Sequence, residues 1–231
     1  MNANRDYFVS IFPVFLLCLS LFAMCIPSQI SAQDKIAEKK PFGTEAIWNP
    51  TDTIIQDMGK LCENGGDCFI RKMIEAGASP SSVEFTKTLI NKDFPFCFMK
   101  SFQDMGHVDL VMVDCPFMAN TMGFTLLANG NPSIFLPGNS KYLDKIDLSK
   151  DPMYSTIIKK YPHAEIWLDG KLDRTVTSAD GGQRFIWKHK ILNGCRACEV
   201  AGTATVSYDF DKNGKYKGVQ LLKLSEEDLC Q

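Results

Sequence analysis

The sequence predicts an α+β fold in which a small N-terminal helical subdomain is followed by a mainly antiparallel β-sheet with a C-terminal meander. Two observations support this prediction. Apolar residues recur at helical spacing between residues 51 and 91, and apolar and polar residues alternate over long stretches between residues 185 and 224. Helices in one part of the chain and strands in the other are typical of α+β proteins.

The chain begins with a 20-residue apolar run, from Tyr7 to Ile26, that follows a single arginine, Arg5. Small residues come next, and the pattern is typical of an export signal cleaved after Ala32. The run is also long enough to cross a bilayer uncleaved, because about 20 residues suffice. We therefore expect a signal peptide at residues 1–32 and a secreted or periplasmic protein, with an N-terminal membrane anchor as the alternative.

The remaining chain is long enough for one folded unit. We expect a polar linker at residues 33–48, the helical subdomain at residues 49–92 and the β-rich domain at residues 93–231. The net charge of −2 leaves no basic surplus that could neutralise phosphates, so the composition argues against a nucleic-acid partner.

The helical subdomain is expected to contain three short helices. The first begins near Asp52 and ends at Cys62, and Asp67 would cap the second after a glycine break. Ser79 and Pro80 are suited to begin the third, because serine caps helices and proline at the first helical position loses no hydrogen bond.

Strand signals replace helical ones from Phe94 onward. The expected strands are residues 107–114, 125–128, 133–136, 164–168, 185–191, 198–210 and 216–224. A short helix after Asp151 interrupts them, and Asp169-Gly170 is expected to form a turn. The strand at residues 198–210 alternates so regularly that one of its faces should be wet.

Seven of the nine cysteines follow Ala32, and in an exported protein they are expected to form disulfides. The favoured pairs are local: Cys62 with Cys68 across the glycine break, Cys97 with Cys115 on either side of Gly106, and Cys195 with Cys198 in a CxxC motif. Cys230 would then be the unpaired thiol, because the count is odd.

The CxxC motif is the sharpest chemical candidate. Redox enzymes usually place the first cysteine at a helix N-terminus, which lowers its pKa. Here Asn193 and Gly194 precede the motif and strands flank it, so we expect a hairpin turn that holds a structural disulfide. A redox-active pair and half of a zinc site are the alternatives, and Glu199 stands where covalent haem attachment would need a histidine.

A second motif resembles the first half of a calcium loop. Asp209, Asp211 and Asn213 alternate and are followed by Gly214, as calcium loops require. The bidentate carboxylate expected at the twelfth position is replaced by Gln220, however. A hairpin turn at Asn213-Gly214 explains the same residues more simply.

No catalytic signature stands out in the rest of the chain. The sequence contains no G-x-S-x-G, H-E-x-x-H, S-x-x-K, P-loop or G-x-G-x-x-G motif, and its three histidines are scattered. We therefore predict a non-enzymatic, disulfide-stabilised exported protein without a cofactor that binds a protein or small ligand outside the cytoplasm. A thiol–disulfide oxidoreductase using Cys195 and Cys198 is the alternative, and a calcium-stabilised module is the third hypothesis.

Overall fold

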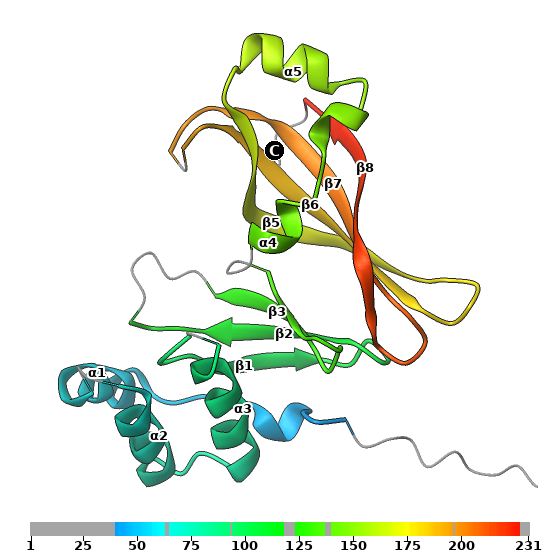
Figure 1. Ribbon diagram of the computed structural model, residues 1–231. Helices are drawn as coiled ribbons and strands as arrows, with labels where there is room; N and C mark the ends of the chain where they lie inside the picture. Colours follow the sequence, from blue (N-terminus) through cyan, green and yellow to red (C-terminus); the bar gives the residue numbers. More distant parts are fainter. Residues whose placement is uncertain are drawn as a thin grey trace, which may run out of the picture. The chain divides into compact units, whose positions relative to one another are not determined.

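A computed structural model describes residues 40–62, 65–92, 94–117, 123–136, 140–195 and 197–226. The expected signal peptide, its cleavage site at Ala32 and the thiol of Cys230 lie outside these residues. A few helices between residues 44 and 90 are followed by two antiparallel four-stranded sheets, so the α+β prediction is confirmed (Figure 1). Within the described residues, no helix is long and apolar enough to span a membrane.

The N-terminal helices begin largely where their caps predict. They are η1 (Thr44–Ala46), α1 (Asp52–Leu61), α2 (Gly66–Glu75) and α3 (Pro80–Ile90). The Ser79 hydroxyl accepts the Ser82 N–H at 3.0 Å, and Pro80 occupies the first turn of α3 as expected. The cap expected at Asp67 is wrong. Gly65 is the N-cap instead, because its φ of 147° suits glycine, and Asp67 lies in the first turn.

The first sheet has the strand order β1-β2-β3-β4. Its strands are β1 (Phe98–Gln103), β2 (Asp109–Asp114), β3 (Phe124–Ala128) and β4 (Ile134–Phe135). Successive residues of β3 face opposite sides, as a strand requires. Leu126 joins the cluster that contains Phe85 and Leu89 of α3, whereas Leu127 joins the cluster formed by the second sheet. The first sheet is therefore buried on both faces.

The second sheet is the antiparallel meander that the C-terminal alternation predicts. Its strands are β5 (Ala164–Thr177), β6 (Gln183–Asn193), β7 (Val200–Phe210) and β8 (Tyr216–Ser225), in that order. The turn expected at Asp169-Gly170 is wrong, because β5 continues through it. Ile166 stands opposite Ile191 and Gly170 opposite His189, so a bulge absorbs two extra residues. A side chain at Gly170 would collide with the Lys188 carbonyl oxygen, which explains the glycine.

One face of the second sheet forms the larger core. It is covered by residues from α4 (Ser140–Leu143) and α5 (Tyr154–Lys160), which Figure 1 shows on the same side of the sheet, and η2 (Leu148–Lys150) lies between them in sequence. Its buried side chains include Phe185 and Trp187 of β6 and Tyr208 of β7. The imidazole Nε2 of buried His189 lies 3.0 Å from the Tyr208 hydroxyl oxygen, so this histidine belongs to the core.

The other face of β7 is not wet, contrary to expectation. Thr203, Thr205 and Ser207 are at most 5% exposed. Lys190 and Lys188 of the neighbouring β6 stand opposite the two threonines. Long lysine stems can cover apolar and short polar neighbours while their charged ends stay in water. A central strand with short polar side chains is therefore buried although its sequence pattern indicates exposure.

Gln183, at the start of β6, joins the two sheets. Its Oε1 accepts the Val108 N–H at 2.7 Å, and its Nε2 donates to the carbonyl oxygens of Met105 and Val108 at 2.6 and 3.1 Å. Gln183 is only 5% exposed, so these bonds replace contacts with water. A second link is formed by Asn131, whose backbone N–H and carbonyl bond to Gly214 and Tyr216.

Residues 40–48, which we expected to be linker, are packed against the first sheet. The Lys40 ammonium lies 2.8 Å from the buried carboxylate of Asp109 and 2.7 Å from the exposed carboxylate of Asp104. The Phe42 N–H donates to Asn129 Oδ1 at 3.1 Å, and the Asn129 amide donates back to the Phe42 carbonyl at 2.8 Å. We call this set of contacts the N-terminal anchor. The polar composition predicts a linker, because the sequence does not show that a charged residue such as Lys40 pairs with a buried carboxylate.

Candidate functional site

The six described cysteines form three disulfides, Cys62–Cys68, Cys97–Cys115 and Cys195–Cys198. These are the three pairs that the sequence analysis favours. Cys62–Cys68 connects the end of α1 to the start of α2, and Cys97–Cys115 closes the β1–β2 hairpin. The protein is therefore disulfide-stabilised.

The three disulfides differ in their exposure to solvent. Cys97 and Cys115 are at most 1% exposed, whereas Cys62 is 4% exposed and its partner Cys68 is half-buried. Cys195, in contrast, is exposed and its partner Cys198 is half-buried. The CxxC disulfide therefore presents sulfur that a reagent in solution can reach.

The CxxC motif lies in the turn between β6 and β7, as its flanks predict. The Cys198 N–H donates to the Cys195 carbonyl at 3.0 Å, and the Asn193 N–H donates to the Glu199 carbonyl at 3.1 Å. No helix begins at Cys195, so the motif lacks the helix dipole that acidifies the first cysteine of many redox enzymes. Arg196 lies outside the described residues.

A pocket of about 630 Å³ opens beside this disulfide, and we call it the CxxC pocket. Besides the two cysteines, its lining includes Tyr154 and Ile158 of α5 together with His163 and Glu165. The sequence offered no partner for His163. In the structure, the backbone N–H of His163 donates to the side chain of Asn193 at 3.1 Å. The two residues are 30 positions apart, so the sequence does not indicate this contact.

Gly194 allows His163 to approach the CxxC turn closely. Its φ of 84° lies in the region that favours glycine, and a Cβ at this position would lie 3.2 Å from the His163 Cβ. His163 therefore lies next to Gly194, the residue that precedes Cys195. The structure places a histidine, a carboxylate and an accessible disulfide around one pocket.

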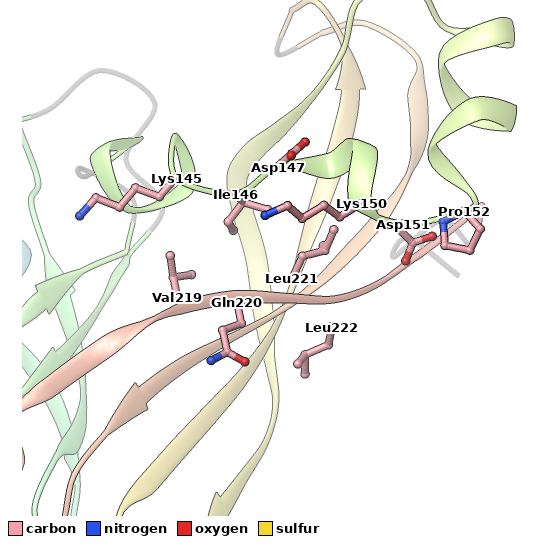
Figure 2. A pocket seen from close by; sticks show the side chains of 10 residues that line it. All are labelled: Lys145, Ile146, Asp147, Lys150, Asp151, Pro152, Val219, Gln220, Leu221 and Leu222. Carbon is pink, nitrogen blue, oxygen red and sulfur yellow. The ribbon is translucent and has the colours of Figure 1, made fainter.

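A second pocket, of about 430 Å³, lies beside β8, and we call it the β8 pocket. One wall is the segment 145–152 and the other is formed by residues 219–222 of β8 (Figure 2). In Figure 2, Val219 and Leu221 point toward the segment 145–152, whereas Gln220 and Leu222 point to the other side of the strand. The pocket therefore has an apolar strip along its strand wall.

The two carboxylates of the β8 pocket accept hydrogen bonds, whereas its two lysines form no short ion pair within the described residues. Asp151 accepts the N–H groups of Met153 and Leu224, each at 2.8 Å. The hydroxyl and N–H of Ser149 lower the pKa of Asp147 by hydrogen bonding to its carboxylate. The charge of Lys150 also contributes to the low pKa of Asp147. Across the described ranges, no ion pair involves Lys145 or Lys150, so both ammonium groups can contact a ligand, although the lining carries as many carboxylates as lysines.

The outer edge of β8 is open next to this pocket. β8 is the last strand of its sheet, and other segments accept hydrogen bonds from its outer edge at two points. The Tyr216 N–H donates to the Asn131 carbonyl at 3.0 Å, and the Leu224 N–H donates to Asp151. Between them, residues 217–223 have no backbone partner other than β7 in the part of the chain that the structure describes.

The three residues of the calcium hypothesis have other roles. Asp209 forms two hydrogen bonds with the Arg184 guanidinium, at 2.7 and 3.0 Å. Asp211 accepts the N–H groups of Asn213 and Lys215, each at 2.9 Å, and these bonds lower its pKa. Among the described residues, no three His, Cys, Asp or Glu side chains are grouped as a metal site would require. The geometry is that of a hairpin turn stabilised by an aspartate.

The fold and these sites define the chain as a disulfide-stabilised α+β protein that carries the CxxC pocket and the β8 pocket. Comparison with known proteins adds no family to this description. No family model, no curated protein and no solved structure matches the chain.

Proposed function

We propose that this protein works outside the cytoplasm as a binding protein, which takes up an extended, acidic peptide segment of a partner protein along β8. The observation that supports this proposal is the open outer edge of β8 at residues 217–223, beside a pocket lined by Lys145 and Lys150. The three disulfides support the location, because such bonds persist in oxidising compartments.

The binding mode is addition of a strand to the sheet. An extended peptide can hydrogen-bond to an exposed sheet edge through its backbone, while pockets for alternate side chains give specificity. The peptide's inward side chains would meet the apolar strip of Val219 and Leu221. Since the edge is bounded by Tyr216 and Leu224, a short segment fits between the two closed positions.

The charge of this region selects an acidic peptide. Lys145 and Lys150 line the pocket together with Asp147 and Asp151. Lys217 and Lys223, exposed on β8 itself, add the positive charge that these two carboxylates do not balance. Lysines on an edge strand also discourage accidental pairing with other chains. A ligand that carries carboxylates is attracted to these lysines, whereas a basic strand is repelled and a neutral strand gains no attraction.

The test is a selection from a random heptapeptide library displayed on phage, with the purified protein as bait. We expect the selected peptides to be enriched in Asp and Glu and depleted in Pro. A synthetic copy of the best peptide should bind at least about tenfold more weakly to the double variant Lys145→Glu, Lys150→Glu, because two attractions become repulsions. Raising the salt concentration should weaken binding to the unaltered protein as well.

The matched control is the double variant Lys60→Glu, Lys159→Glu, which changes the net charge equally at exposed positions on α1 and α5. It should bind the peptide like the unaltered protein. Peptides without acidic residues, or equal weakening in both double variants, would refute the proposal.

A further inference from the structure

We propose that the Cys195–Cys198 disulfide is a second functional site, at which the disulfide is transferred to a dithiol of a partner protein and His163 moves the proton. This inference does not depend on peptide binding at β8. It goes beyond stabilisation, the role that the sequence favours for this pair, and it rests on the arrangement around the CxxC pocket.

Accessibility separates this disulfide from the buried Cys97–Cys115. Thiol–disulfide exchange requires that a thiolate approach a sulfur atom directly, so a buried disulfide is protected. Cys97–Cys115 is buried in the core, whereas Cys195 is exposed at the edge of a pocket of about 630 Å³. A cysteine side chain of a partner protein can therefore reach Cys195 without unfolding of the sheet.

The surrounding structure does not depend on this bond. The disulfide closes a sequence separation of only three residues, at the tip of the β6–β7 hairpin. Pairing of β6 with β7 reaches Leu192 and Val200, and the bond from the Asn193 N–H to the Glu199 carbonyl lies between that pair and the motif. The hairpin therefore keeps its register after reduction, and the site can exist in both redox states.

His163 supplies the proton transfer that exchange needs. Imidazole is the side chain that most readily gives and takes a proton near neutral pH. Gly194 lets His163 lie next to the residue before Cys195, and both cysteines line the same pocket as His163. A nearby proton donor takes over the activating role that a helix N-terminus has in other CxxC proteins.

The reaction consists of two exchanges. First, a thiolate of the partner attacks the sulfur of Cys195, the Cys195–Cys198 bond breaks, and the Cys198 sulfur takes the electron pair and a proton from the His163 imidazolium. Next, neutral His163 accepts the proton of the partner's second thiol, which attacks the mixed disulfide. Cys195 leaves as a thiolate and is protonated by His163. The partner dithiol is oxidised to a disulfide, and Cys195 and Cys198 become thiols.

The first experiment measures which disulfide opens. After free thiols are blocked with iodoacetamide, the purified native protein is treated with increasing dithiothreitol, quenched with a second alkylating reagent and mapped by mass spectrometry. We expect Cys195–Cys198 to open at least about a hundredfold faster than Cys97–Cys115. Equal rates for the two disulfides would overturn the proposal.

The second experiment tests the role of His163. The rate of opening by dithiothreitol should fall at least about tenfold in the His163→Gln variant, since positioned proton transfer typically contributes more than that. The dependence of the rate on pH near neutrality should also change, which a purely structural role of His163 would not produce. The control is His107→Gln, an exposed histidine outside the pocket, which should leave rate and pH profile unchanged.

Two outcomes would contradict this site without touching the β8 proposal. One is an unchanged rate and pH profile in His163→Gln. The other is tight zinc binding by the reduced pair together with failure to oxidise a dithiol, which would assign Cys195 and Cys198 to a metal site. Peptide binding at β8 is measured with lysine variants distant in sequence from the motif, so the two proposals can fail separately.

Discussion

Gln183 shows how much one side chain contributes when it satisfies buried backbone groups. It bonds to the N–H of Val108 and to two carbonyl oxygens of the segment that connects β1 and β2. Gln183→Leu keeps an apolar stem of similar size but leaves those groups without partners. Each buried group left unsatisfied costs roughly 1–3 kcal/mol, so for three groups we expect the free energy of unfolding to fall by at least about 3 kcal/mol.

Urea unfolding followed by tryptophan fluorescence measures this loss. Gln56→Leu, on the exposed face of α1, is the control and should change the free energy of unfolding by less than about 0.5 kcal/mol. If both variants were equally stable, Gln183 would not join the sheets in solution.

Single glycines show where sequence reasoning at the residue scale fails. Asp67 and the pair Asp169-Gly170 were assigned from residue preferences, which describe isolated caps and turns. The structure uses Gly65 for its positive φ and Gly170 for its small size next to the Lys188 carbonyl. Gly65 is required by its backbone conformation alone, since a Cβ there would meet nothing within 4 Å, whereas the requirement at Gly170 comes from packing with a residue distant in sequence. The same applies to His163, whose place beside Gly194 depends on a contact that spans 30 residues.

At the scale of elements, the disulfides should differ in their contribution to stability. Cys97–Cys115 closes a sequence separation of 18 residues and Cys62–Cys68 one of 6. In the loop-entropy description these bridges contribute about 3 and about 2 kcal/mol. Since Cys97 and Cys115 are also buried in the core, we expect Cys97→Ala, Cys115→Ala to destabilise more than Cys62→Ala, Cys68→Ala.

Thermal unfolding of the two double variants checks this order. The midpoint of Cys97→Ala, Cys115→Ala should be lower by several degrees than that of the other double variant. The reverse order would mean that the helix connection at Cys62, rather than the β1–β2 hairpin, limits stability.

The β7–β8 hairpin should not respond to calcium. The carboxylate of Asp209 is held by Arg184, and that of Asp211 accepts two N–H groups of its own turn. Calcium would have to replace these bonds without a bidentate carboxylate at Gln220. We expect the unfolding midpoint to be the same in millimolar calcium and in a chelator, and a rise of several degrees with calcium would restore the calcium-loop hypothesis.

Alternation of apolar and polar residues predicted the elements of the C-terminal part well. The strands at residues 200–210 and 216–225 agree closely with the expected ranges, because a meander is made by local hairpins whose turns are visible in sequence. The division into two sheets was not predicted. The sequence does not show which sheet β3 or β7 joins, because sheet membership is set by backbone pairing with neighbouring strands.

At the scale of the whole molecule, the N-terminal anchor should make stability depend on pH. The hydrogen bond from Lys40 and the N–H of Gly106 hold the pKa of Asp104 below its usual value. A carboxylate whose pKa is lower in the folded state stabilises the protein fully above its unfolded pKa, and this contribution is lost as the pH falls through the folded pKa. We therefore expect stability to decline in the acid range.

The Lys40→Met variant tests the anchor. It should lower the free energy of unfolding at neutral pH by about 2 kcal/mol, because the buried carboxylate of Asp109 loses its ion partner. The acid decline should also be shallower than in the unaltered protein when unfolding midpoints are compared from about pH 2 to pH 7. Lys60→Met, on the exposed side of α1, is the control and should keep both properties. Parallel pH curves for the unaltered protein and Lys40→Met would show that the anchor carries no charge-dependent stability.

The N-terminal anchor also determines where a mechanical load would enter the protein. A force that pulls on the chain ahead of Lys40 meets the ion pair with Asp109 and, two residues later, the paired hydrogen bonds between Phe42 and Asn129. Asp109 belongs to β2 and Asn129 follows β3, so tension passes first into the interior strands of the first sheet. The three N-terminal helices are shielded from that tension until these contacts rupture.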